Sequence, residues 1–117
     1  MIEGRIKRVA DNRILFDRVR RTETAWQRMR GLLGTKGLAQ GEGLLIEPCP
    51  SVHSFGMRYA IDVIYLDSEN RVLKTVARLK PMRMSYCRKA KKTLEVAAGR
   101  VQKQNIQAGD CLIWEQQ

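Results

Sequence analysis

The chain has 117 residues, of which 44% are hydrophobic and 29% charged, and its 22 Lys and Arg exceed its 12 Asp and Glu, giving a formal net charge of +10 at pH 7. This length and composition exclude a disordered or collagen-like chain and suit one domain, residues 1–117, with one hydrophobic core. No apolar run approaches the roughly 20 residues of a membrane-spanning helix, and the N-terminus does not resemble a signal peptide. Three cysteines are too few for a secreted disulfide framework. We therefore expect a basic cytoplasmic protein without a transmembrane segment.

The first half of the chain predicts strands that flank one short helix. Ile2-Glu3-Gly4-Arg5 matches the recognition sequence of a protease used to remove expression tags, so the sequence of residues 1–5 is given no functional interpretation. Thr24 and Gln27 have the spacing of a capping box and predict a helix that begins after Thr24. The apolar face of this helix is expected to contain Trp26, Met29, Leu32 and Leu33. The strands expected in this half cover residues 5–10, 13–20 and 44–46.

The second half contains the most β-branched run of the sequence, Ile61–Leu66, which predicts a central strand. The basic stretch 83–92 is compatible with a loop or a weak helical turn, and residues 101–106 with one or two helical turns. Further strands are expected over residues 71–79, 93–96 and 111–115. This pattern predicts a mainly β fold, a single compact antiparallel β-sandwich or barrel with one or two short helices.

Two neighbouring segments carry a family resemblance. Cys49-Pro50-Ser51-Val52-His53-Ser54-Phe55-Gly56-Met57-Arg58, followed by Ile61–Asp67, resembles the bacterial and archaeal family called domain of unknown function 192. The Leu94-Glu95-Val96-Ala97-Ala98-Gly99 segment has a counterpart there too. The resemblance implies a compact, jelly-roll-like β-sandwich and no established activity or cofactor. Many members have an aromatic–Trp–Met–Lys motif where this chain has Phe55-Gly56-Met57-Arg58, which fits a His-containing subgroup.

His53 is the only histidine, and no serine, cysteine or second histidine is placed by the sequence to complete a catalytic arrangement with it. We therefore assign no catalytic residue and no cofactor. Cys49 and His53 have C-x3-H spacing, and Cys87 fits the pattern of the subgroup. These three residues are weak candidates for zinc or copper ligands, and Cys49 and Cys87 for a reversible disulfide. The more ordinary expectation is reduced thiols without metal.

The leading hypothesis is a non-enzymatic binding or accessory domain, because specific polar residues lie in a loop between proline breaks where packing alone does not require them. Its surface would combine the 53–58 loop with the basic loop 81–92, and its partner is an unidentified ligand or protein. The residues proposed to bind are His53, Phe55, Met57, Arg58, Asp62, Arg83 and Arg88. For Phe55 and Met57 the alternative is core packing, and for Asp62 an internal ion pair with Arg58. Two other functions stay open: a nonspecific nucleic-acid binder that uses the basic surface, and a small metal-dependent or hydrolytic enzyme centred on His53.

Overall fold

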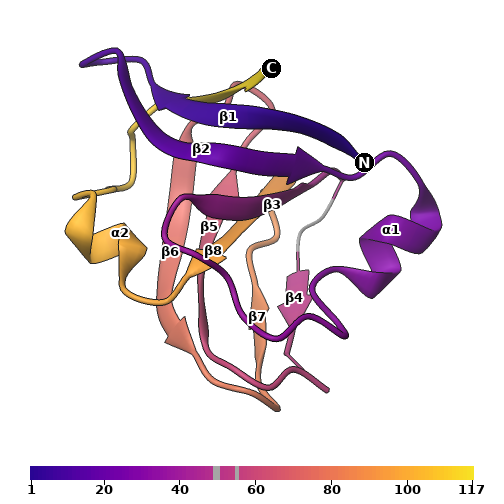
Figure 1. Ribbon diagram of the computed structural model, residues 1–117. Coiled ribbons are helices and arrows are strands. Elements are labelled where there is room, and N and C mark those ends of the chain that lie inside the picture. The colour runs from indigo at the N-terminus through magenta and orange to yellow at the C-terminus, as the bar shows by residue number, and fades with distance from the viewer. Residues whose placement is uncertain (49–50, 55) are drawn as a thin grey trace.

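The computed structural model describes residues 1–48, 51–54 and 56–117, and of residues 51–53 only the backbone. Nine strands and two short helices are seen in this part of the chain (Figure 1). The helices are α1 (Ala25–Arg30) and α2 (Arg100–Lys103). The strands are β1 (Ile2–Arg8), β2 (Arg13–Arg21), β3 (Glu42–Ile46), β4 (Ser51–His53), β5 (Ile61–Leu66), β6 (Val72–Leu79), β7 (Met84–Tyr86), β8 (Lys92–Ala97) and β9 (Leu112–Gln116). No described helix is long and apolar enough to cross a membrane.

Seven strands form one strongly twisted sheet in the order β6-β5-β8-β3-β2-β1-β9, and β4 pairs with β7 in a separate two-stranded sheet (Figure 1). The mainly β fold with two short helices is therefore confirmed. The barrel alternative is wrong, because in the described chain the edge strands β6 and β9 approach each other only around the isolated bridge between Arg71 and Cys111. An entirely antiparallel sheet is also wrong. β2 and β3 run parallel, since α1 and the loop after it carry the chain back before β3 begins.

Both faces of the sheet are covered by apolar side chains. The apolar side chains form two clusters, one on each face. Ile64 and Leu66 of β5 belong to the first cluster, and Ile61, Val63 and Tyr65 belong to the second. Every residue of β5 is buried, as expected for a strand with both faces covered. The first cluster consists of Ile6, Leu15, Phe16, Val19, Leu45, Ile64, Leu66, Val72, Leu94, Val96, Val101, Ile106 and Leu112. The second consists of Leu32, Leu44, Ile46, Met57, Ile61, Val63, Tyr65, Leu79 and Ala90.

Helix α1 starts as the sequence predicts. The Thr24 side chain accepts a hydrogen bond from the Gln27 amide at 3.1 Å, and the Gln27 side chain accepts one from the amide of Thr24. The prediction for its apolar face is only partly right, because Trp26 and Met29 are 69% and 71% exposed. The helix ends at Arg30, and Gly31 takes a positive φ of 53°. Because the chain turns at Gly31, Leu32 and Leu33 lie beyond the helix and do not share the helical face that the prediction assumed.

Asp62 is fully buried in β5 and joins three elements. Its Oδ1 accepts a hydrogen bond from the amide of Arg78 in β6, and its Oδ2 accepts one from the amide of Val101 in α2, each at 2.9 Å. Arg78 has a positive φ of 54°, and the register of the β5–β6 pair shifts at this point. The alternative ion pair with Arg58 is not formed among the described residues, because Arg58 is exposed and both Asp62 oxygens accept hydrogen bonds from backbone amides.

Asp62→Asn should lower the free energy of unfolding by about 3 kcal/mol, because one of the two amide donors would then face an NH2 group instead of an oxygen. Urea unfolding followed by circular dichroism measures this change. Asp17→Asn is the matched control, since Asp17 is exposed, and it should change the stability by less than about 0.5 kcal/mol. Equal losses of stability in Asp62→Asn and Asp17→Asn would contradict a stabilising role for the two amide hydrogen bonds at Asp62.

Candidate functional site

The two segments expected to form a recognition surface lie side by side. Strand β4 pairs with β7, with Ser51 opposite Tyr86 and His53 opposite Met84. Ser54 is completely buried at the end of this pair, which we call the β4–β7 ribbon (residues 51–54 and 82–86). Its amide donates to the carbonyl of Arg83 at 2.8 Å, and its hydroxyl oxygen accepts from the amide of Arg83 at 2.9 Å. The expectation of a loop or helical turn over 83–92 is thus wrong for β7, a strand too short to show a period of its own.

The outer side of the ribbon is apolar and surrounded by positive charge. Met84 is 67% exposed, Met82 and Tyr86 are also exposed, and Ser85 between them is buried. Residues 71–94 contain no Asp or Glu, but their Lys and Arg side chains are Arg71, Lys74, Arg78, Lys80, Arg83, Arg88, Lys89, Lys91 and Lys92. Within the described chain only Lys92 of this set forms an ion pair. The exposed apolar side chains of Met82, Met84 and Tyr86 therefore lie in a part of the chain whose Lys and Arg side chains, apart from Lys92, form no ion pair among the described residues.

The other sequence candidates differ in what the structure says of them. Arg58, Arg83 and Arg88 are exposed. Met57 is buried in the second cluster, which fits the packing alternative. Cys49 and Phe55 lie outside the described residues, and only the backbone of His53 is described, so the metal and disulfide hypotheses stay open. Cys87 is a half-buried free cysteine, and no group of three His, Cys, Asp or Glu that could hold a metal is found in the described residues.

Glu95 is a polar residue that the sequence analysis did not single out. It lies in the middle of β8, paired with Leu44 of β3 and Val63 of β5, and is 4% exposed. No hydrogen-bond partner reaches its Oε1 among the described residues. Burial raises the pKa of Glu95 from its ordinary value of 4.5 to about 7. A lone acidic residue between apolar neighbours in the expected strand 93–96 is the signal that would have found it.

Tyr59 and Thr35 lie on the same side of the sheet as Glu95. The hydroxyl groups of Thr35 and Tyr59 are 2.6 Å apart, and Thr35 also donates to the carbonyl of Leu32. Burial, opposed in part by the Thr35 hydrogen bond, raises the pKa of Tyr59, and the charges of Glu95 and Glu42 raise it further. A hydroxyl pair and a buried carboxyl are thus held close together near the end of α1.

The comparisons agree with this fold. The model of a family described as DUF192, Uncharacterized ACR, matches residues 6–114. The chain belongs to this family. No curated protein matches it. A solved structure from Sinorhizobium meliloti 1021, described as a "putative transcription regulator", has a TM-score of 0.84 and 21% identity over 96% of this chain and 93% of its own. A protein of unknown function from Novosphingobium aromaticivorans DSM 12444 has a TM-score of 0.79 and 18% identity, over 96% of this chain and 84% of its own.

At these identities the two solved structures support the fold alone. The family has no characterised activity in its description, so its members give no site to transfer. Function must therefore be argued from the ribbon and from the surroundings of Glu95.

Glu95→Gln should make the protein more stable at pH 8 and change little at pH 5. The pKa of Glu95 is raised in the folded state, so folding takes up a proton between about pH 4.5 and 7, and the free energy of unfolding falls as the pH rises through this range. The gain of the variant at pH 8 should approach about 3 kcal/mol, measured by urea unfolding at both pH values. Glu23→Gln, at an exposed position, should show no such pH-dependent difference. A gain from Glu95→Gln that is equal at both pH values would contradict the raised pKa.

Proposed function

We propose that this chain is a non-catalytic binding domain, located in the cytoplasm, that captures an acidic protein segment on the β4–β7 ribbon. The observation that carries the proposal is the exposure of Met84 and Tyr86 on a strand within residues 71–94, a stretch that contains nine Lys and Arg and no Asp or Glu. Exposed apolar side chains bordered by charge mark interaction surfaces. The proposed surface includes His53 and Arg83 of the ribbon, together with Arg58 and Arg88 in the segments that follow its two strands.

The ribbon is suited to binding because its backbone is already fixed. Ser54 holds Arg83 through both its amide and its hydroxyl group, and Lys74 donates to the carbonyl of Tyr86 at 3.1 Å. A fixed backbone reduces the conformational entropy lost on binding. Methionine adapts to different apolar partners, and the unpaired Lys and Arg side chains attract an acidic chain before contact is made.

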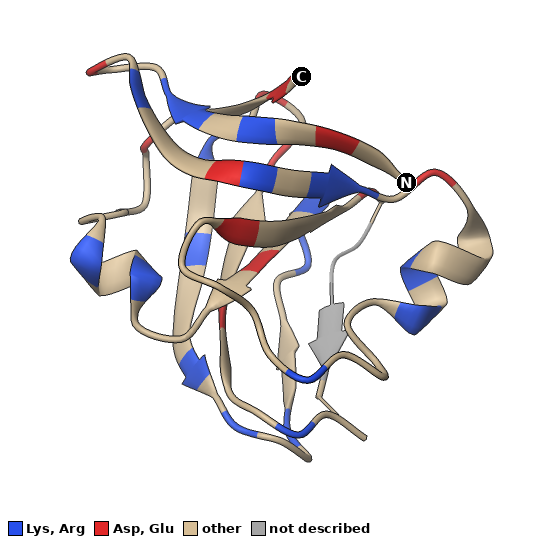
Figure 2. Ribbon diagram, viewed as in Figure 1, with Lys and Arg blue, Asp and Glu red and all other residues tan. Residues whose placement is uncertain are grey.

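The second candidate is binding of nucleic acid. The net charge of +10 favours it, as does the description of the Sinorhizobium protein as a "putative transcription regulator". However, Lys and Arg are spread over α1, α2, β1, β2 and the loops at the ends of β6 and β7 (Figure 2). Phosphate contacts also need no exposed methionine or tyrosine. An acidic partner with apolar side chains uses both features of the ribbon.

The test compares a labelled peptide of alternating Glu and Leu with labelled single-stranded RNA and duplex DNA, by fluorescence anisotropy at two salt concentrations. The peptide should bind, and Met84→Ser combined with Tyr86→Ser should weaken it about tenfold, because two exposed anchor side chains are removed. Arg88→Glu combined with Lys89→Glu should weaken it similarly and reduce its salt dependence. Thermal unfolding should be nearly unchanged in these variants.

Charge reversal at Arg13 and Lys103, both exposed and outside the ribbon, is the matched control and should leave peptide binding within about twofold. Tight RNA or DNA binding that is insensitive to Met84→Ser and Tyr86→Ser would favour the second candidate. Failure of the peptide to bind even at low salt would contradict the ribbon as a surface for acidic segments.

A further inference from the structure

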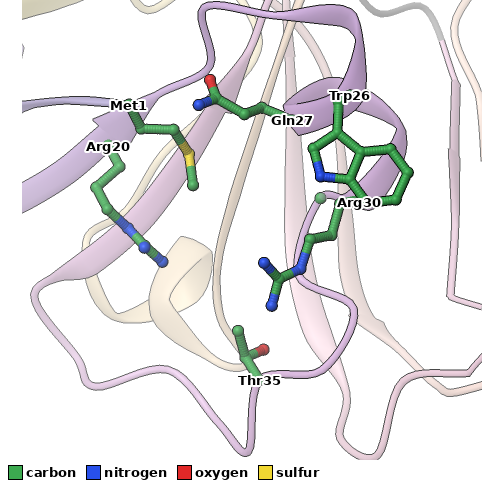
Figure 3. Close-up of a pocket in the computed structure, with 7 residues that line it drawn as sticks. Met1, Arg20, Trp26, Gln27, Arg30 and Thr35 are labelled. Carbon is green, nitrogen blue, oxygen red and sulfur yellow. The ribbon is translucent and has the colours of Figure 1, made fainter.

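A cavity of about 310 Å³ lies between β2 and the end of α1, apart from the ribbon. Figure 3 shows the guanidinium groups of Arg20, from β2, and Arg30, from α1, directed into the space between them, with Thr35 on one side and Met1 and Gln27 on the other. The residues that line the cavity are Met1, Arg20, Trp26, Gln27, Arg30, Gly31 and Thr35.

The two arginines bring uncompensated positive charge to this space. Neither forms an ion pair with a described residue, and the nearby carboxylate of Glu42 is 3.8 Å from Arg18 instead. Glu3 is the neighbour of Arg20 across the β1–β2 pair but makes no ion pair with it in the described structure. Arg30 is oriented by a hydrogen bond of 3.2 Å from its Nε to the carbonyl of Leu33. Two guanidinium groups that converge without a carboxylate are suited to binding an anion.

The buried carboxyl of Glu95 lies beneath the cavity at Gly31. An ideal Cβ on Gly31 would be 3.9 Å from the Glu95 Oε1, and Gly31 itself lines the cavity. This oxygen is buried and has no partner among the described residues. The carboxyl is closed off from the cavity and does not line it. The charge that a ligand would meet in the cavity therefore comes from Arg20 and Arg30.

The polar side chains around the cavity are already fixed by the protein. The Gln27 Oε1 accepts the amides of Glu23 and Thr24 in the capping box, so that its NH2 group is the part left to meet a ligand. The Thr35 hydroxyl is held by Leu32 and Tyr59. Trp26, at the rim, is 69% exposed, which is unusual for tryptophan unless its ring has a binding partner.

We infer that this cavity binds a small one-ring aromatic anion, whose carboxylate or phosphate group bonds to Arg20 and Arg30 and whose ring lies against Trp26. The cavity is near the lower end of the roughly 300–1,000 Å³ that small-molecule sites occupy, which limits the ligand to one ring. The inference does not depend on the ribbon, because no residue of the ribbon lines the cavity.

Labelling with 5-fluorotryptophan gives two fluorine NMR signals, because the chain has two tryptophans. Trp114 is the internal control, since its Nε1 donates to the carbonyl of Val19 and Arg21 stacks on its ring, and Trp26→Phe assigns the signals. Benzoate and phenyl phosphate should each shift the Trp26 signal with saturation and leave the Trp114 signal in place. The tighter of the two identifies carboxylate or phosphate as the preferred anion. Uncharged benzamide and ringless acetate should bind at least tenfold more weakly than benzoate.

Substitutions then test each part of the site. Arg20→Gln and Arg30→Gln should each weaken binding of benzoate about tenfold, whereas Arg28→Gln, on the same helix but outside the cavity lining, should change it less than twofold. Glu95→Gln should leave the affinity for benzoate nearly unchanged, because the Glu95 Oε1 is closed off from the cavity. Circular dichroism verifies that each variant is folded.

Several results would overturn the inference. They are a Trp26 signal that does not saturate with either anion, benzamide that binds as well as benzoate, and equal losses in Arg28→Gln and Arg30→Gln. Acetate binding as tightly as benzoate would remove the role of the ring.

Discussion

The carboxylate of Asp62 is the constraint on which the arrangement of β5, β6 and α2 depends. Because it is fully buried, it needs donors, and it receives two backbone amides at 2.9 Å. The register shift in the β5–β6 pair frees the amide of Arg78 from the strand ladder. The other donor is the amide of Val101 in α2, and the Val101 side chain packs in the first cluster. The bulge and the position of α2 are thus two consequences of satisfying one buried charge. This makes Asp62 a positioning residue of the fold rather than part of a surface.

Glu95 is a second buried carboxyl group, but unlike Asp62 it receives no hydrogen bond at its Oε1 from the described residues. It lies on the second face of the sheet, on the strand next to β5, and its Oε1 has no donor in the described chain. The molecule tolerates the group because its raised pKa keeps it largely uncharged up to about neutral pH. An ideal Cβ on Gly31, which lines the cavity, would be 3.9 Å from the Glu95 Oε1, so the buried carboxyl lies behind the cavity and is separated from it by the backbone at Gly31.

Local signals predicted much of the fold. The capping box at Thr24 and the run Ile61–Leu66 each specify an element through neighbours in sequence, and each is found. A strand is also found over the expected residues 13–20, although its buried positions do not alternate. The parallel β2–β3 pair could not be predicted, because it depends on where α1 returns the chain. The same holds for exposed Trp26, since periodicity shows which side chains share a face but not whether anything covers it. For the candidate sites, the sequence located the ribbon segments but missed Glu95, whose importance depends on the strands on both sides.

Ser54, Gly56 and Tyr59 lie in or next to the 53–58 loop that the sequence pointed to as a binding surface, and the structure gives each of them a positioning role. Ser54 fixes the ribbon through Arg83, and Tyr59 bonds to Thr35 at the edge of the cavity. Between them, Gly56 has a positive φ of 83°, and a Cβ there would be 3.2 Å from the Leu33 side chain. Glycine at this position allows the chain to pass close to the loop after α1. Ser54, Gly56 and Tyr59 therefore help to position the ribbon and the edge of the cavity, whichever partner each surface binds.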